Sequence, residues 1–301
     1  MQAIPDTMRA LLVREHGWPS AMRVERVARP TPGEGQVLVR VRAAGLNFAD
    51  TLVIGGSYQE RQVPPFVPGA ELCGDIVACG PDVRDWRVGE RVMGQVDAGA
   101  YAEYAVADAR RIVRVPPGMA DDVAAGFYIP YGTALCALRE RGRLEPGQTL
   151  LVLGAAGAVG QAAVQVGRAL GARVVGTSRH ESRRDAVMGA GAESFVATAG
   201  LAGDALRDRL LEATGGADLV LDTVGGALAL AALRCLRFEG RLVVIGFTAG
   251  DAPAFRANHL LVKNVDIVGC YWGPYQTRRP DETRRAFETL ADWHARRLIH
   301  P

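Results

Sequence analysis

Short segments in which apolar and polar residues alternate dominate the first 115 residues of the chain. Alternation with a period of two is typical of β-strands that bury one face. Glycine and proline recur between these segments, and one short helical turn is expected at 47–54. The expected strands are 8–13, 22–27, 36–43, 72–78, 91–96, 100–106 and 111–115. Many short strands with frequent turns predict a compact β-barrel.

The pattern changes after the Pro116-Pro117-Gly118 segment. A helix is expected at 121–125, and continuous apolar runs then alternate with longer amphipathic stretches. The expected strands are 149–153, 172–177, 193–197, 218–222, 241–246 and 265–270. The expected helices are 158–170, 181–189, 204–213, 226–236 and 280–298. Regular strand–helix alternation predicts a parallel sheet with helices on both faces, the α/β class.

The segment 150–160 (LLVLGAAGAVG) predicts a buried strand, a turn of small residues and the start of a helix. This geometry cradles a pyrophosphate, because small residues allow close approach and the helix N-terminus offers free N–H groups. The turn fits the dinucleotide fingerprint with alanine in place of the first glycine. The alternative is a tight strand-to-helix turn, but the strand at 172–177 completes a βαβ unit. We therefore predict nucleotide binding by Ala155, Ala156, Gly157, Ala158, Val159 and Gly160.

The end of the second strand of this unit bears on the choice between NAD and NADP. NAD enzymes usually carry Asp or Glu there, to accept a hydrogen bond from the ribose 2′-OH. Here the segment 176–180 reads GTSRH, and further arginines follow at 183 and 184. Arginine suits a phosphate, so we predict NADPH, held by Ser178, Arg179 and Arg183. The alternative is a solvated basic helix start, and Glu181 nearby favours it.

Composition narrows the function classes. The 301 residues are 49% hydrophobic and 23% charged, with a net charge of +2, so neither nucleic acid nor an anionic membrane is an expected partner. Apolar runs fall short of membrane-spanning length, and no signal-peptide pattern is seen. Five scattered cysteines form neither a disulfide framework nor a C-x-x-C metal motif. We expect a cytoplasmic protein of two domains.

Several motifs, in their order and spacing, carry a resemblance to a known family. The chain resembles the zinc-free branch of the medium-chain dehydrogenase/reductase superfamily, specifically the NADPH:quinone oxidoreductase (ζ-crystallin-like) family. Segment 45–51 (GLNFADT) looks like that family's G-x-N-x-x-D-T motif, and 67–74 (VPGAELCG) looks like its P-G-x-E-x-x-G turn. Further matches are 88–92, 99–104, 155–160 and 222–226.

The resemblance implies a GroES-like β-barrel catalytic domain at 1–120 and a doubly wound Rossmann domain at 121–274. Residues 275–301 are expected to return to the barrel. Family chains normally add another barrel strand after the last helix, so we expect a short C-terminus and a missing edge strand. A truncated chain, a shortened relative, or a partner that covers the gap would each account for this.

Zinc relatives in the superfamily carry metal ligands at two positions that differ here. Their cysteine corresponds to Asn47 and their histidine to Ala70, and their cysteine-rich structural-zinc loop has no counterpart between Gly94 and Ala100. Zinc sites need at least three N, S or O ligands held in place. We therefore expect no metal.

The resemblance also implies an active site, with the nicotinamide between sheet and barrel. Asn47 and Tyr58 are expected to line it, and Asp50 is assigned to the same catalytic loop, as an anchor of its backbone. Hydride transfer to a quinone or enone builds negative charge on oxygen, which N–H and O–H donors stabilise. Either Tyr58 or solvent could supply the proton. Leu52 stands where some relatives carry a second tyrosine.

The remaining predicted cofactor residues lie in the second half of the chain. Thr133 matches the family threonine that faces the nicotinamide; alternatively it is a mid-helix threonine that bonds back to a carbonyl. Tyr271 and Trp272 follow the last strand, where they could close the cofactor site or form a dimer seam. Gly246 completes the set.

The predicted function is that of an NADPH-dependent, zinc-independent reductase of quinones or α,β-unsaturated carbonyls. Within the same class, the alternative is an enoyl-thioester reductase, which needs a basic CoA-binding rim. From another class, the alternative is a non-catalytic NADPH-binding protein, crystallin-like or RNA-associated. The expected partners are a small-molecule substrate and, as is common in the family, a second copy in a homodimer.

Overall fold

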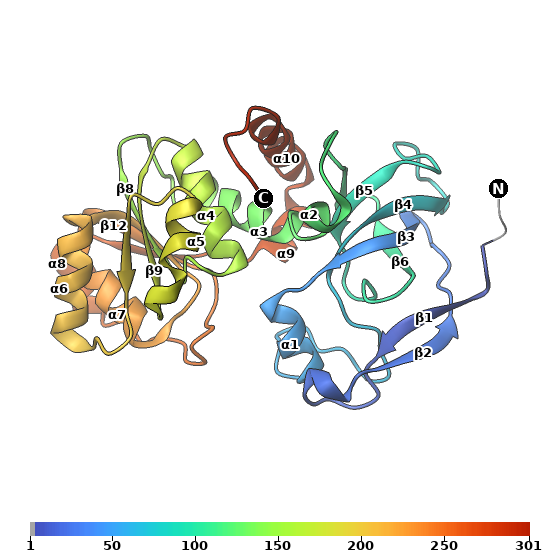
Figure 1. Cartoon of the computed structure of the whole chain (residues 1–301), viewed down its shortest axis with the longest axis horizontal. Coiled ribbons are helices and arrows are strands. Elements are labelled where there is room, and N and C mark those ends of the chain that lie inside the picture. Colours follow the sequence, from blue (N-terminus) through green and yellow to red (C-terminus); the bar gives the residue numbers. More distant parts are fainter. Residues whose placement is uncertain (1–3) are drawn as a thin grey trace. The chain divides into compact units, whose positions relative to one another are not determined.

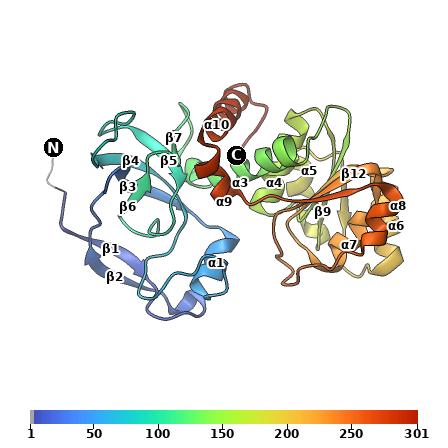
Figure 2. The same ribbon diagram turned by 180° about the vertical axis from the view of Figure 1, so that it is seen from behind.

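Two sheets of different type account for the two patterns in the sequence. The computed structural model describes residues 4–301 and divides them into two units (Figures 1 and 2). The first unit contains the described residues up to Ile129 together with Gln276–Arg284. The second contains Pro130–Tyr275 and Arg285–Pro301. The domain limits expected from the sequence, 120/121 and 274/275, stay a prediction.

The first unit is built on an antiparallel sheet of five strands in the order β6-β3-β4-β5-β7. Its strands are β3 (Gln36–Gly45), β4 (Glu71–Cys79), β5 (Arg91–Gln95), β6 (Tyr104–Asp108) and β7 (Ile112–Arg114). A separate hairpin pairs β1 (Thr7–Leu12) with β2 (Arg23–Ala28). Alternate residues of the strands point inward, so Val37, Val39, Leu72 and Val92 are fully buried in one core. Burial of alternate residues in this core is what the period-two pattern predicts, although Leu38 and Cys73 on the opposite face are buried too.

One strand of the first unit was predicted with the wrong bounds. Residues 100–103 were expected to begin a strand, but β6 begins at Tyr104. The amides of Ala100 and Tyr101 instead donate to the carbonyls of Gly69 and Pro68, at 3.1 and 3.0 Å. These bonds tie the segment to the loop before β4. Ala102 also forms an isolated antiparallel bridge with Ala10 of β1, so the segment pairs outside the five-stranded sheet.

The second unit contains a parallel sheet of six strands in the order β10-β9-β8-β11-β12-β13. The strands are β8 (Thr149–Leu153), β9 (Arg173–Ser178), β10 (Ser194–Ala197), β11 (Ala217–Asp222), β12 (Leu236–Val244) and β13 (Asp266–Gly269). Helices α4 (Ala158–Ala169) and α5 (Arg184–Gly189) cover one face, and α6 (Gly203–Thr214) and α7 (Gly226–Arg234) cover the other (Figure 1). The predicted fold class is therefore confirmed.

Several helices escaped prediction. They are η1 (Pro19–Ala21), α3 (Tyr128–Leu135) with the π-helical turn η2 (Cys136–Arg141), α8 (Ala257–Lys263) and α9 (Trp272–Arg278). Helix α3 and the first turn of η2 are buried almost all round, so their sequence shows no amphipathic period. The predicted helices α1 (Phe48–Ile54), α2 (Asp121–Ala125) and α10 (Pro280–Ala295) are present, with α10 ending before the expected residue 298.

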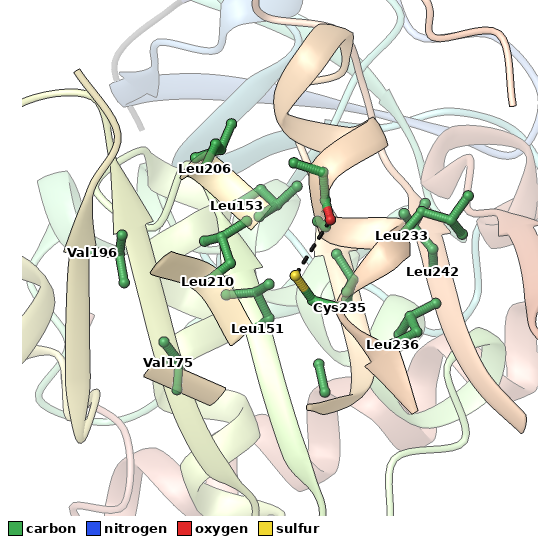
Figure 3. Packing of buried hydrophobic residues seen from close by; sticks show 14 of the residues in the cluster. Leu151, Leu153, Val175, Val196, Leu206, Leu210, Leu233, Cys235, Leu236 and Leu242 are labelled. Carbon is green, nitrogen blue, oxygen red and sulfur yellow. Dashed lines mark hydrogen bonds between the residues drawn. The ribbon is translucent and has the colours of Figure 1, made fainter. Parts of the chain in front are cut away.

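A leucine-rich core lies between the parallel sheet and helices α6 and α7 (Figure 3). Leu151 and Leu153 of β8 meet Leu206 and Leu210 of α6, and all four are buried. Burying one leucine side chain contributes about 1.5–3 kcal/mol. Cys235 lies in the same core, where its Sγ donates to the carbonyl of Ala231 at 3.3 Å. This core holds the carboxyl end of β8, and so the turn that follows it, in place.

The structure also bears on two expectations drawn from composition, which concern membrane-spanning segments and cysteines. No helix among residues 4–301 is long and apolar enough to cross a membrane. All five cysteines are free, and four of them are buried. The four buried thiols pack as small apolar residues.

Candidate functional site

The turn after β8 depends on Gly154. This residue has φ +71°, a left-handed conformation that favours glycine, and a Cβ there would lie 2.6 Å from Thr223 Oγ1. The Thr223 hydroxyl donates to the carbonyl of Leu153 at 2.9 Å, so it cannot move away cheaply. Gly154 therefore makes the tight turn, one residue before the position expected from the fingerprint. This explains why Ala155 is tolerated.

The other two glycines of the turn, Gly157 and Gly160, differ in how much space surrounds them. A Cβ on Gly160 would lie 2.1 Å from the carbonyl oxygen of Gly154 and 2.7 Å from Ala155 Cα. Gly160 thus lets helix α4 pack directly on the turn. Gly157 is exposed, and the nearest atom to a Cβ there would be the Gly154 oxygen at 3.5 Å. Nothing in the protein itself requires glycine at Gly157, whereas a ligand that approaches the backbone closely would.

The first turn of α4 offers N–H groups to such a ligand. The amides of Ala158, Val159 and Gly160 have no acceptor within the helix, because the first regular bond runs from Gln161 N to Gly157 O at 2.8 Å. Gly157 is the N-cap and supplies no side-chain cap. Gly157 and Ala158 are exposed to solvent. A helix N-terminus of this kind binds anions, so the residues present fit the pyrophosphate of a dinucleotide.

The end of β9 carries uncompensated positive charge. Arg179 and Arg183 are exposed, and neither forms an ion pair within residues 4–301. The nearby acidic residue, Glu181, pairs with Arg184, whose guanidinium also lies 5.0 Å from the centre of the Phe195 ring. Glu181 is thereby neutralised by its own partner. Two arginines are left to receive an anion beside Ser178.

Of the other predicted cofactor residues, two lie at the carboxyl edge of the parallel sheet and two are buried. Gly246 follows β12, and Tyr271 follows β13 and is 47% exposed. Since the sheet is parallel, these positions share its carboxyl edge with the glycine turn and the end of β9. Trp272 is buried, and a Cβ on Gly132 would lie 2.7 Å from its ring. Thr133, the next residue along α3, is also buried.

The first unit places Asn47 and Asp50 at the start of α1. Asn47 is the N-cap, and its backbone N–H donates to Asp50 Oδ2 at 2.8 Å. The same oxygen accepts the hydroxyl of Tyr101 at 2.7 Å, and the amide of Ala70 also donates to this carboxyl. Burial raises the pKa of Asp50, while these donors oppose the rise. Asp50 thus ties α1 to two loops, and its role in a catalytic loop stays a prediction.

Glu71 was missed by the sequence reasoning. The residue is 1% exposed. Its Oε2 accepts a hydrogen bond from Asn47 Nδ2 at 3.0 Å, and its Oε1 accepts one from the amide of Ile129 at 2.8 Å. Burial raises its pKa to about 8. The available signal was the glutamate of the P-G-x-E turn, which matched the family without being assigned a role.

Tyr58 lies on the loop after α1, in the same unit as Asn47, and is half-buried. The hydrogen bonds that join Asn47, Asp50, Glu71 and Tyr101 do not include it. Its catalytic role stays a prediction.

Comparison with known proteins identifies the family. Residues 33–117 match the alcohol dehydrogenase GroES-like domain, and residues 158–292 match the family model described as zinc-binding dehydrogenase. The rat protein "Quinone oxidoreductase-like protein 2" is 36% identical over 283 residues, which cover 93% of this chain and 80% of the relative. The chain belongs to the medium-chain dehydrogenase/reductase family, among its quinone oxidoreductase-like members.

Two mycobacterial proteins extend the comparison. The structure of mycobacterial Rv1454c complexed with NADPH aligns with a TM-score of 0.89 and 31% identity, covering 97% of this chain and 90% of that one. A segment of 240 residues, 78% of this chain, is 35% identical to 11% of the phthioceranic/hydroxyphthioceranic acid synthase of Mycobacterium tuberculosis.

One matched family model is described as zinc-binding, so potential metal ligands matter. Among residues 4–301, no group of three or more His, Cys, Asp and Glu side chains is arranged to hold a metal ion. At the positions of two zinc ligands in medium-chain dehydrogenases, Asn47 donates to Glu71, and Ala70 contributes only a backbone amide to Asp50. These residues serve a hydrogen-bond network.

Proposed function

We propose that this protein is an NADPH-dependent, zinc-independent reductase that transfers hydride to quinones or α,β-unsaturated carbonyls. The observation that carries the proposal is the pair of unpaired arginines, Arg179 and Arg183, at the same sheet edge as the glycine turn. Support also comes from the rat relative named for quinone oxidoreductase and from the mycobacterial relative complexed with NADPH.

Residues of the second unit would hold the cofactor. The amides of Ala158, Val159 and Gly160 would bind the pyrophosphate, and Ser178, Arg179 and Arg183 would bind the 2′-phosphate. Thr133, Gly246, Tyr271 and Trp272 remain the predicted residues around the rest of the molecule. When bound, NADPH supplies the hydride.

Residues of the first unit would act on the substrate carbonyl. Asn47 is held at its backbone by Asp50, so its carboxamide can present an N–H to the oxygen on which negative charge develops. The Tyr58 hydroxyl lies on the next loop and either donates a second hydrogen bond or supplies the proton. Asp50 stays an anchor, because its Oδ2 is already bonded to Asn47 and Tyr101.

The test replaces Arg179 and uses Arg184 as the matched control. Arg179→Ala removes a free guanidinium, whereas Arg184→Ala removes one already paired with Glu181. A hydrogen bond to a charged group contributes about 1.5–3 kcal/mol. Arg179→Ala should therefore lower the affinity for NADPH by about 10- to 100-fold. NADH affinity should hardly change, and Arg184→Ala should leave the NADPH:NADH ratio near that of the wild type. If Arg179→Ala lowered the affinity for NADPH and for NADH equally, a 2′-phosphate site at Arg179 would be ruled out.

Enoyl-thioester reduction is the second candidate. The observation that favours it is the match to a segment of a synthase that is named for an acid product. Quinones and enoyl thioesters both place negative charge on a carbonyl oxygen after hydride addition, so Asn47 would serve either. Comparing kcat/KM for a simple quinone and an enoyl-CoA separates the two candidates.

A further inference from the structure

We propose that Glu71 is a positioning residue: its buried carboxylate fixes which end of the Asn47 carboxamide faces the substrate. The inference rests on the proposed function, since it concerns the donor that Asn47 presents to the reacting carbonyl. The Asn47–Glu71 hydrogen bond joins the N-cap of α1 to the first residue of β4.

The surroundings of Glu71 are built for a carboxyl group. Oε1 accepts the amide of Ile129 at 2.8 Å, and the amide of Tyr128 also donates to this carboxyl. Both amides lie at the start of α3, where the helix dipole favours negative charge. A Cβ on Gly45 would lie 2.6 Å from Oε2 and 2.3 Å from the carbonyl of Ala125. Gly45 therefore makes room for the carboxyl group.

The chemistry of the two side chains determines the orientation. A carboxamide has a donor end, Nδ2, and an acceptor end, Oδ1, whereas a carboxylate only accepts. Asn47 must therefore turn Nδ2 toward Glu71, because the reverse orientation would set Oδ1 against a carboxylate oxygen. Nδ2 carries two protons and donates one to Oε2 at 3.0 Å. The second proton is then held in one direction, as a preorganised donor requires.

Two carboxyl groups thus hold different parts of Asn47. Asp50 accepts the backbone N–H of Asn47 and is itself held by the Tyr101 hydroxyl. Glu71 accepts the side-chain amide. The first bond fixes where the residue lies, and the second fixes which way its carboxamide faces.

Protonation of Glu71 would reverse the carboxamide. Oε1 faces the amide of Ile129, so the proton would sit on Oε2 and would need Asn47 Oδ1 as its acceptor. The titratable groups around Glu71 are Asp50, Tyr101 and Tyr128. Burial, followed by the charge of Asp50, raises the pKa of Glu71 to about 8. The productive orientation therefore belongs to the ionised form, and turnover should rise as the pH approaches that value.

The test uses Glu71→Gln, which keeps the size of the side chain. The amide oxygen of the glutamine must stay on the Ile129 N–H, so its NH₂ group points at Asn47 and forces the carboxamide to reverse. We expect kcat to fall by about 10- to 100-fold with NADPH affinity near that of the wild type. The thermal midpoint should match that of the wild type at about pH 4.5 and below, where Glu71 is protonated. The rise of kcat with pH should disappear in this variant.

Two further variants keep the result interpretable. Asn47→Ala should lose turnover, and Glu71→Gln combined with Asn47→Ala should lose no more than Asn47→Ala alone, because Glu71 acts through Asn47. If Glu71→Gln folds poorly, adding Asn47→Asp restores a donor–acceptor pair, and stability should recover without turnover.

Each other outcome overturns the inference. Wild-type turnover and pH dependence in Glu71→Gln, with Asn47→Ala inactive, would refute the positioning role and leave the proposed function standing. If the loss of kcat in the double variant equalled the product of the losses in the two single variants, Glu71 would act independently of Asn47. Wild-type turnover in Asn47→Ala would remove both the donor role of Asn47 and the inference.

Discussion

Replacing Gly160 with alanine should destabilise the second unit and weaken NADPH binding. The added Cβ would lie 2.1 Å from the carbonyl oxygen of Gly154 and 2.7 Å from Ala155 Cα. Both are backbone atoms, so no side chain can rotate away, and the start of α4 must separate from the turn by about an ångström to reach ordinary contact.

The expected cost follows from overpacking. Forcing extra atoms into a well-packed site costs about 1–3 kcal/mol. For a unit of this size, each kcal/mol lowers the thermal midpoint by about 2–4 °C, so we expect a fall of roughly 2–12 °C. The same displacement moves the amides of Ala158 and Val159. Because each hydrogen bond to a charged group contributes about 1.5–3 kcal/mol, the affinity for NADPH should fall by more than tenfold.

Gly157→Ala is the matched control within the same turn. Gly157 has φ −80°, which alanine adopts freely, and the nearest atom to its Cβ would be 3.5 Å away. Its stability should change by less than about 1 kcal/mol, the usual difference between glycine and alanine at an N-cap. NADPH affinity should still fall, since the methyl group would occupy space that the pyrophosphate needs.

The assays are thermal unfolding without cofactor and fluorescence titration with NADPH. An unchanged thermal midpoint in Gly160→Ala would contradict the steric reasoning. Wild-type NADPH affinity in Gly157→Ala would show that the pyrophosphate does not approach this turn.

Three further predictions concern the first unit and the core. Tyr58→Phe should lower kcat while sparing NADPH affinity; an unchanged rate would remove Tyr58 from the proton and oxyanion roles. The folded state holds a proton on Glu71 that the unfolded state releases above about pH 4.5, so wild-type stability should fall relative to Glu71→Gln by about 1 kcal/mol per pH unit up to about pH 8. Parallel denaturation curves against pH for the two proteins would contradict that burial. Leu210→Ala should destabilise by about 2–5 kcal/mol in urea unfolding, because Leu210 is fully buried between α6 and the sheet; a loss below about 1 kcal/mol would contradict it.

Much of the fold could be predicted because most elements bury one face. Helix α4 shows the amphipathic period, and strand β8, which is buried on both faces, is recognisable as a short continuous apolar run; the limits of both agree with the prediction to within a residue. Helix α3 could not be found, since its burial on nearly all sides leaves no polar face in the sequence. Tertiary packing, rather than local pattern, fixes such a helix.

The candidate site was predictable where chemistry is local. The glycine turn and Arg179 lie in recognisable positions, although the turn glycine proved to be Gly154. The P-G-x-E turn marked Glu71 but not its contacts, because only the fold shows that this glutamate is buried against Asn47 and Ile129. The homodimer and the catalytic role of Tyr58 stay predictions.

The most direct test of the proposed function follows the absorbance of NADPH and NADH with the purified protein. The acceptors are a simple quinone, an ortho-quinone, an alkenal and an enoyl-CoA. We predict oxidation of NADPH by a quinone or alkenal, much faster than that of NADH. Tight NADPH binding without turnover on any acceptor would contradict the proposal and favour a non-catalytic nucleotide-binding protein.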